Sequence, residues 1–209
     1  MRTIISVAVL IIGLFASAAS ARTMSDFFIN EPDSVFVQID KSARMDMVDY
    51  FHSGKKVDTM NRLGGKSRIE ELTDDYMRVR LSDCAEVALH SYIAGNDTLL
   101  LVVNTLKTPA LDSRLMTFVN DWTPADAGRY IRLPEVEDFI SGVSGKQRKQ
   151  LAALVEFSLM SLTVAPDGKL TARLTVERYM GTEDYARLKP YLKESIIYSW
   201  DGKKFRSAK

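Results

Sequence analysis

Residues 63–75, LGGKSRIEELTDD, contain a Gly-Lys-Ser triplet of the kind that binds nucleotide phosphates in P-loops. A P-loop requires the full pattern G-x-x-x-x-G-K-[ST] and a hydrophobic strand ahead of it. Met60 occupies the position of the first glycine, and residues 55–62, KKVDTMNR, are too polar for such a strand. We therefore predict that Gly64 and Gly65 form a loop with positive φ that leads into a sheet.

Asp74 and Asp75 are adjacent carboxylates that could act as an acid–base pair or hold a metal ion. Adjacent side chains point to opposite faces of a strand and diverge in a helix, so these two meet only in a special turn. A solvated turn before Tyr76 fits the sequence better. Residues 166–168, Pro-Asp-Gly, predict a hairpin turn, and no D-x-D-x-D-G calcium loop is present.

Cys84 and His90 suggest a thiol nucleophile with its base, but their spacing on successive strands does not bring the two side chains together. The other histidine, His52, lies at a predicted helix end. A zinc site would need carboxylates as further ligands, and no metal-ligand spacing occurs. We expect Cys84 to be a free, partly buried thiol. The sequence therefore assigns no catalytic, cofactor-binding or metal-binding residue.

The first 21 residues have the pattern of a cleaved signal peptide. Met1-Arg2-Thr3 is a short basic start, and an apolar run from Ile4 to Phe15 follows. Residues 19–21, Ala-Ser-Ala, form an A-x-A cleavage site, so we expect the cut after Ala21. No cysteine follows for a lipid anchor, and no later stretch has the roughly 20 apolar residues of a membrane helix. The sequence predicts a soluble protein that is periplasmic or secreted.

Composition narrows the classes of partner. The chain has 28 Lys and Arg against 27 Asp and Glu, a net charge of +1, which argues against nucleic acid or an anionic membrane as the main partner. Cys84 is the single cysteine, so no internal disulfide can form. The 46% hydrophobic content is enough for a packed core at this length.

Hydrophobic periodicity predicts two similar halves after the signal peptide. In the first, residues 32–39 and 45–52 have helical spacing, and strands follow at 77–81, 87–93, 98–106 and 115–119. In the second, helices are expected after Pro134 and at 146–155, with strands at 157–164, 170–176 and 196–200 around a helical segment at 181–191. Residues from Thr123 resemble a linker. We therefore predict an α+β fold of two tandem units, 22–125 and 126–209, each a short helix pair packed on an antiparallel β-sheet.

The chain also resembles a known family. Residues 31–83, from EPDSVFVQID to DDYMRVRLSD, are similar to the opening block of an exported family from gut-type Gram-negative bacteria. DSRLMTFVNDWTP (112–124), LTVAPDGKLTARLTV (162–176) and LKPYL (188–192) fit its later blocks. The family is a domain of unknown function, so the resemblance implies an exported bacterial protein and assigns no functional residue. The expected layout is also similar to β-lactamase-inhibitor-protein-like and PepSY-like architectures, an analogy of fold that does not determine function.

The polar positions of the strands could form a recognition surface. If helices cover one face of each sheet, the other face carries polar and aromatic residues together: Arg78, Arg80, Thr171, Arg173, Thr175, Glu177, Tyr92, Tyr179 and Tyr198. Such a face is either plain solvated surface or a concave surface for a protein or peptide, where Arg and aromatic side chains are typical anchors. We expect Trp122 and Trp200 to be core edges and not ligand platforms.

Three functions from different classes follow. The leading hypothesis is a non-catalytic binding or interaction module of the periplasm or cell envelope, whose partner is a protein or peptide. The first alternative is an inhibitor or regulator of an exported enzyme, on the architectural analogy. The second is an enzyme whose site is assembled from distant residues. The sequence favours the absence of catalysis and implies no cofactor.

Overall fold

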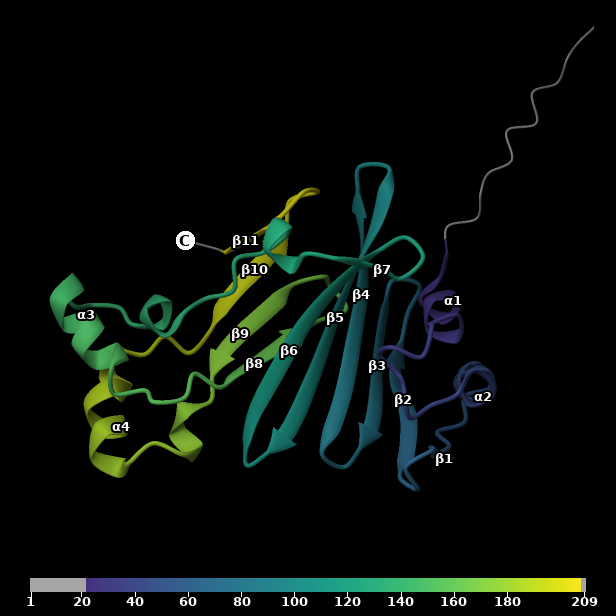
Figure 1. Cartoon of the computed structure of the whole chain (residues 1–209), viewed down its shortest axis with the longest axis horizontal. Helices are drawn as coiled ribbons and strands as arrows, with labels where there is room; N and C mark the ends of the chain where they lie inside the picture. Colours follow the sequence, from purple (N-terminus) through teal and green to yellow (C-terminus); the bar gives the residue numbers. More distant parts are fainter. Residues whose placement is uncertain (1–21, 208–209) are drawn as a thin grey trace, which may run out of the picture.

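The computed structural model describes residues 22–207. The segments of the first half in which apolar and polar residues alternate form the larger of two antiparallel sheets (Figure 1). Its seven strands lie side by side in chain order, each paired with the next. They are β1 (Thr59–Met60), β2 (Lys66–Leu72), β3 (Tyr76–Ser82), β4 (Ala85–Ala94), β5 (Asp97–Thr108), β6 (Ala110–Val119) and β7 (Thr123–Ala125). In β3, Met77, Val79 and Leu81 are buried on one face. Tyr76 packs on the other face, so the two faces contribute to different cores.

Two helices cover one face of this sheet (Figure 1). They are α1 (Met24–Ile29) and α2 (Lys41–His52). A capping box at Thr23 and Asp26 starts α1, and the Asp40 carboxylate accepts from the Ala43 backbone N–H at the start of α2. Their apolar side chains pack with the buried residues of β2 to β5, and Trp122 Nε1 donates to Phe27 O at 3.0 Å.

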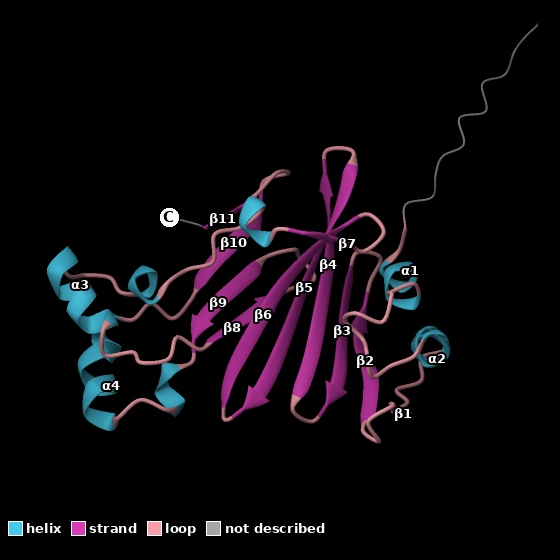
Figure 2. Ribbon diagram, viewed as in Figure 1, coloured by secondary structure: helices cyan, strands magenta, loops and turns pink. Residues whose placement is uncertain are grey.

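The smaller sheet packs against the opposite face of the larger one, so the second core lies between two sheets (Figure 2). Its strands are β8 (Met160–Val164), β9 (Leu170–Leu174), β10 (Ile196–Trp200) and β11 (Phe205–Ser207), in the order β11-β10-β9-β8. The inward residues of β8 and β9, such as Leu162 and Leu170, meet Leu99 and Leu101 of β5. Along one side, Ser113 Oγ of β6 accepts from the Leu162 N–H at 3.0 Å.

The remaining helices lie at one end of the smaller sheet and do not cover its face (Figure 2). They are α3 (Gly145–Ala152) and α4 (Thr182–Leu188), with short 3₁₀ turns η1 (Ala127–Arg129), η2 (Val136–Phe139), η3 (Val176–Arg178) and η4 (Lys189–Tyr191). Ile140, Leu151, Val176 and Leu188 form a third buried cluster between them. None of the helices in the described part of the chain is long and apolar enough to cross a membrane.

The prediction of a helix at 32–39 was wrong. This stretch is irregular because the Glu31 carboxylate accepts from the backbone N–H groups of Ser34 and Val35, at 2.6 and 2.8 Å, which gives the backbone an alternative to helical hydrogen bonds. Arg44 from α2 lies above it, almost fully buried. Its guanidinium donates to Glu31 O, Ile39 O and Asp33 Oδ1, each at 2.7 Å. The first helix of the pair is instead α1.

The α+β class with antiparallel sheets is confirmed, whereas the two tandem units are not. The larger sheet has seven strands and the smaller has four, and the two share one core. Residues from Thr123, expected to be a linker, begin β7. The unit boundary between 125 and 126 stays a prediction. The predicted signal peptide, residues 1–21, lies outside the described residues and also stays a prediction.

Candidate functional site

A shallow groove of about 520 Å³ lies where the end of β4 meets two turns of the smaller sheet. One turn joins β8 to β9 at residues 165–169, and the other joins β10 to β11 at residues 201–204. The residues that shape the groove are His90, Tyr92, Pro166, Asp167, Lys169 and Trp200. The strands of both sheets therefore contribute to one concave surface.

His90 and Tyr92 form the floor of the groove. They follow the period of two in β4, so both rings point toward the smaller sheet, where they stack with ring centroids 4.4 Å apart. Both residues are buried, and Tyr92 Oη donates to Gly168 O at 2.9 Å. Burial raises the pKa of the Tyr92 hydroxyl, and the Asp167 and Asp75 charges raise it further. Tyr92 therefore stays neutral and acts as a hydrogen-bond donor.

The His90 ring connects the two sheets. Its Nδ1 lies 2.8 Å from Ser91 O, and its Nε2 lies 3.4 Å from Pro166 O in the β8–β9 turn. The Asp75 carboxylate is 3.9 Å from Nε2. A neutral imidazole carries one N–H, so only one of these nitrogens can donate, and the shorter contact makes Nδ1 the donor to Ser91 O. Because His90 is only 5% exposed, a substrate has little access to the ring.

Gly168 lets the β8–β9 turn approach this floor. Its φ is +76°, a conformation that glycine adopts without strain. A Cβ atom there would lie 3.3 Å from Tyr92 Cε1 and 3.4 Å from His90 Nε2. Glycine therefore suits this position in two ways: it adopts the backbone conformation without strain, and it places no Cβ against the two rings.

Trp200 forms one wall, and charged side chains form the rim. The Trp200 indole packs on Tyr92 with ring centroids 5.5 Å apart, and its Nε1 donates to Ile93 O at 3.0 Å. At the rim, Lys169 Nζ lies 2.6 Å from Asp167 Oδ2, with both side chains 54% exposed. Hydrogen bonds from the Lys169 side chain and backbone lower the pKa of the Asp167 carboxyl, so the carboxylate stays charged. The groove thus offers a half-buried aromatic wall beside charges of both signs, which is suited to binding.

The Gly-Lys-Ser segment is structural. Gly64 has a φ of +75°, as predicted, whereas Gly65 does not have a positive φ. Ser67 is fully buried, and its Oγ donates to Leu81 O at 2.8 Å. Its hydroxyl is therefore hydrogen-bonded inside the protein. Gly64 and Gly65 lead into β2, whose first residues are Lys66 and Ser67, so the segment is not a phosphate-binding loop.

The other residues considered for chemistry lie apart from one another. Asp74 and Asp75 sit in the turn between β2 and β3, as predicted, and only Asp75 reaches the groove. Cys84 is free as predicted but exposed, because it lies in the tight turn between β3 and β4, which corrects the expected partial burial. His52 Nε2 lies 3.5 Å from Ser25 Oγ at the end of α2. Within residues 22–207, no three His, Cys, Asp or Glu side chains gather as metal ligands would.

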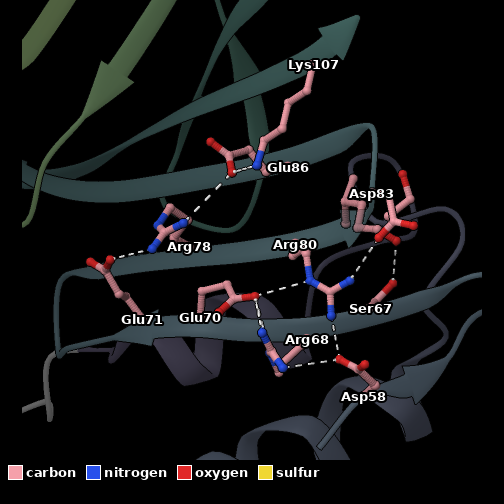
Figure 3. Close-up of polar contacts among 12 residues, drawn as sticks. Asp58, Ser67, Arg68, Glu70, Glu71, Arg78, Arg80, Asp83, Glu86 and Lys107 are labelled. Carbon is pink, nitrogen blue, oxygen red and sulfur yellow. Dashed lines mark hydrogen bonds and ion pairs between the residues drawn. The ribbon is translucent and has the colours of Figure 1, made fainter. Parts of the chain in front are cut away.

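Arg78 and Arg80 lie on the larger-sheet face opposite α1 and α2, outside the core shared with the smaller sheet (Figure 3). Each is paired within the chain. Arg78 Nη2 is 2.6 Å from Glu71 Oε1, and Arg80 Nη2 is 2.5 Å from Asp58 Oδ1. Arg80 Nε also contacts Glu70, so these arginines belong to an ion-pair network and are not unpaired anchors.

The same network places two arginines opposite each other. Arg68 and Arg80 are direct cross-strand partners, a pairing that destabilises a sheet when uncompensated. Glu70 compensates it by accepting from Arg68 Nη2 at 2.9 Å and Arg80 Nε at 3.2 Å (Figure 3). Partial burial raises the pKa of Glu70, but the hydrogen bonds and charges of Arg68 and Arg80 together lower it more, so the net shift of the pKa is downward.

The predicted aromatic residues are mostly core residues. Tyr92 and Tyr198 are buried between the sheets, and Tyr179 packs beside the third cluster. Trp122 is buried at 5% exposure, which confirms it as a core residue. Trp200 is a core edge as predicted, and it also lines the groove. Thr171, Arg173, Thr175 and Glu177 do not contribute to the groove lining.

Sequence reasoning missed Lys169 and the meeting of β4 with the β8–β9 turn. His90 and Pro166 are 76 positions apart, and no local pattern links them. The one available signal was Pro-Asp-Gly at 166–168, which predicted the turn but not its contact.

These features define an α+β protein with two antiparallel sheets packed face to face and a groove at one end of their junction. The chain belongs to the family described as "Protein of unknown function (DUF3256)", which matches residues 16–205. A solved structure, that of a domain of an uncharacterized protein from Porphyromonas gingivalis W83, shares the fold. It matches with a TM-score of 0.77 and 22% identity, covering 90% of this chain and 100% of that domain. No curated protein matches the chain.

Proposed function

We propose that the protein is an exported, non-catalytic binding module that holds a protein or peptide of the cell envelope in the groove at the sheet junction. The observation that carries this proposal is the combination of a half-buried Trp200 wall with a charged rim at Asp167 and Lys169. Aromatic side chains provide large contact area at low entropic cost, and rim charges select the partner.

The chemistry of the groove favours binding over catalysis. The His90 ring is only 5% exposed, with Nδ1 beside Ser91 O and Nε2 beside Pro166 O, and the burial-raised pKa of Tyr92 keeps its hydroxyl from serving as a base near neutral pH. Neither of the two groups on the floor is therefore free to activate a nucleophile or to abstract a proton from a substrate.

The proposed location rests on residues 1–21. Their basic start, apolar run and Ala-Ser-Ala site are those of a cleaved export signal. A partner in the periplasm or outside the cell would meet the processed chain, which begins at Arg22. If that partner is an exported enzyme whose activity falls on binding, the module acts as its inhibitor or regulator.

The proposal is tested by affinity capture from envelope extracts with two matched variants. Lys169→Glu reverses a charge on the groove rim, whereas Arg173→Glu reverses one outside the groove. Both side chains are 54% exposed, and each pairs with one carboxylate. We expect the unmodified protein and Arg173→Glu to recover the same envelope protein, and Lys169→Glu to recover clearly less.

Two outcomes would oppose the proposal. Recovery of no specific protein by the unmodified chain would remove the support for a binding module. Equal recovery by Lys169→Glu and the unmodified chain would place the binding surface elsewhere. Far-ultraviolet circular dichroism and thermal unfolding of both variants check that each keeps the fold.

A further inference from the structure

A second cavity, of about 430 Å³, lies beside the helical cluster and shares no lining residue with the groove. It is formed by the segment between α3 and β8, the residues after η3, and the first turn of α4. Its volume lies within the range of about 300 to 1,000 Å³ that is common for small-molecule sites.

The walls of this cavity are largely apolar. Leu154, Leu159 and Met180 contribute aliphatic surface, and the rings of Phe157 and Tyr179 contribute aromatic surface. The two rings are arranged edge to face with centroids 6.4 Å apart. Phe157 is 63% exposed, although apolar side chains of this size are usually buried. A ligand that covered Phe157 would remove this apolar area from water.

Two hydrogen-bonded groups keep the aromatic wall in place. Tyr179 Oη donates to Phe157 O, which joins the segment before β8 to the residues after η3. Burial raises the pKa of the Tyr179 hydroxyl, so it remains a donor at neutral pH. This contact joins two of the segments that line the cavity.

The charged groups of the lining are both acidic. Asp184 Oδ1 lies 3.3 Å from Arg187 Nη1, so part of its charge is compensated by a residue outside the lining. Glu156 has no ion-pair partner among the residues that the structure describes. The cavity therefore combines negative charge with aromatic faces, and both attract a cation.

We propose that this cavity is a binding site for a small organic ammonium ion with an aliphatic or aromatic body. The apolar body lies against Leu159, Met180 and Phe157, where it is removed from water. The ammonium group lies at the mouth, near Glu156 and Asp184. A ligand with a carboxylate group would be repelled there by these two negative charges. This site is independent of the groove, so it remains testable if the proposed function fails.

Three probes of nearly equal shape test the charge preference: 2-phenylethylammonium, 2-phenylethanol and 3-phenylpropanoate. Each is titrated into the purified protein while backbone amide shifts are followed by NMR. We expect the ammonium ion to shift amides at 154–159 and 179–184, to bind more tightly than the alcohol by about two- to fivefold, and to compete with it. The carboxylate is expected to bind most weakly of the three.

Matched variants separate the charge of the cavity from its structure. Glu156→Gln and Asp184→Asn each remove one negative charge and should raise the dissociation constant of the ammonium ion about two- to fivefold. Arg187→Gln breaks the same ion pair as Asp184→Asn but leaves the carboxylate free, so it should leave the affinity unchanged or increase it. Glu194→Gln, at a side chain 88% exposed outside the lining, serves as the control and should have no effect.

The proposal is overturned if the ammonium ion shifts no amide of these two segments at millimolar concentration. It is also overturned if the alcohol or the carboxylate binds as tightly as the ammonium ion. If Asp184→Asn and Arg187→Gln weaken binding of the ammonium ion equally, the ion pair only supports α4, and the Asp184 charge does not attract the ligand.

Discussion

Replacing Arg44 with methionine should destabilise the protein strongly. The side chain is 1% exposed, and its guanidinium makes three hydrogen bonds of 2.7 Å to Glu31 O, Ile39 O and Asp33 Oδ1. Its Nη1 is also 3.5 Å from the Glu31 carboxylate, whose side chain is 0% exposed. Methionine keeps the apolar stem but removes the charge and all three donors.

The expected loss is about 3 to 5 kcal/mol of the free energy of unfolding, because Arg44→Met leaves a buried carboxylate without its cation. That is a large share of the roughly 5 to 15 kcal/mol by which folded proteins are stable. Urea unfolding followed by circular dichroism measures this loss. We expect a lower urea concentration at the midpoint of unfolding and a similar dependence of the unfolding free energy on urea concentration. Arg62→Met is the matched control, because Arg62 lies 3.7 Å from the same Asp33 but is 48% exposed.

The control should cost less than about 1 kcal/mol, as exposed ion pairs usually do. Adding Glu31→Gln to Arg44→Met should recover part of the loss, since the buried charge is then absent. If Arg44→Met costs no more than Arg62→Met, the buried network does not organise residues 31–40.

Two further predictions concern Gly168 and Asp201. In urea unfolding, Gly168→Ala should lower the free energy of unfolding by at least about 1 kcal/mol more than Gly142→Ala does. Both glycines have a φ of +76°, but only a Cβ atom at position 168 would contact Tyr92 and His90. Equal losses would contradict the close packing of the turn. For Asp201, hydrogen bonds from the Arg206 side chain and from the Lys204 and Lys203 N–H groups lower its pKa from 3.8 to about 2. Its contribution to stability is therefore complete above pH 4 and is lost as the pH falls toward 2. An NMR titration of its carboxyl carbon with a midpoint near 4 would contradict this pKa.

Regular strands could be predicted from the sequence because the alternation of apolar and polar residues is visible within a few neighbouring positions. In β3 and β9, apolar and polar residues alternate without interruption, so the predicted and observed strands nearly coincide. Strand β2 was missed because its sequence, KSRIEEL, has charged residues on the face that forms the ion-pair network. Pro32-Asp33-Ser34 resembled a helix start, but the Glu31 carboxylate binds the backbone amides there in a loop.

The groove could not be predicted, because it depends on contacts between distant segments. Tyr92 Oη and Gly168 O are 76 positions apart, and the packing of the smaller sheet on the larger one brings them together. The alternation of apolar and polar residues in the sequence predicted that Tyr92 lies on an exposed face of the sheet. It is buried because that face is covered by a second sheet, which the prediction of two separate units did not include.

Site-specific photo-crosslinking in the cells that produce the protein tests the central claim most directly. A photoreactive amino acid replaces Lys169 on the groove rim in one variant and Arg173 outside the groove in another, two positions of equal 54% side-chain exposure. A partner held in the groove predicts one discrete adduct from position 169 and none from position 173. No adduct from position 169, or the same adduct from both positions, would contradict the groove as the binding site.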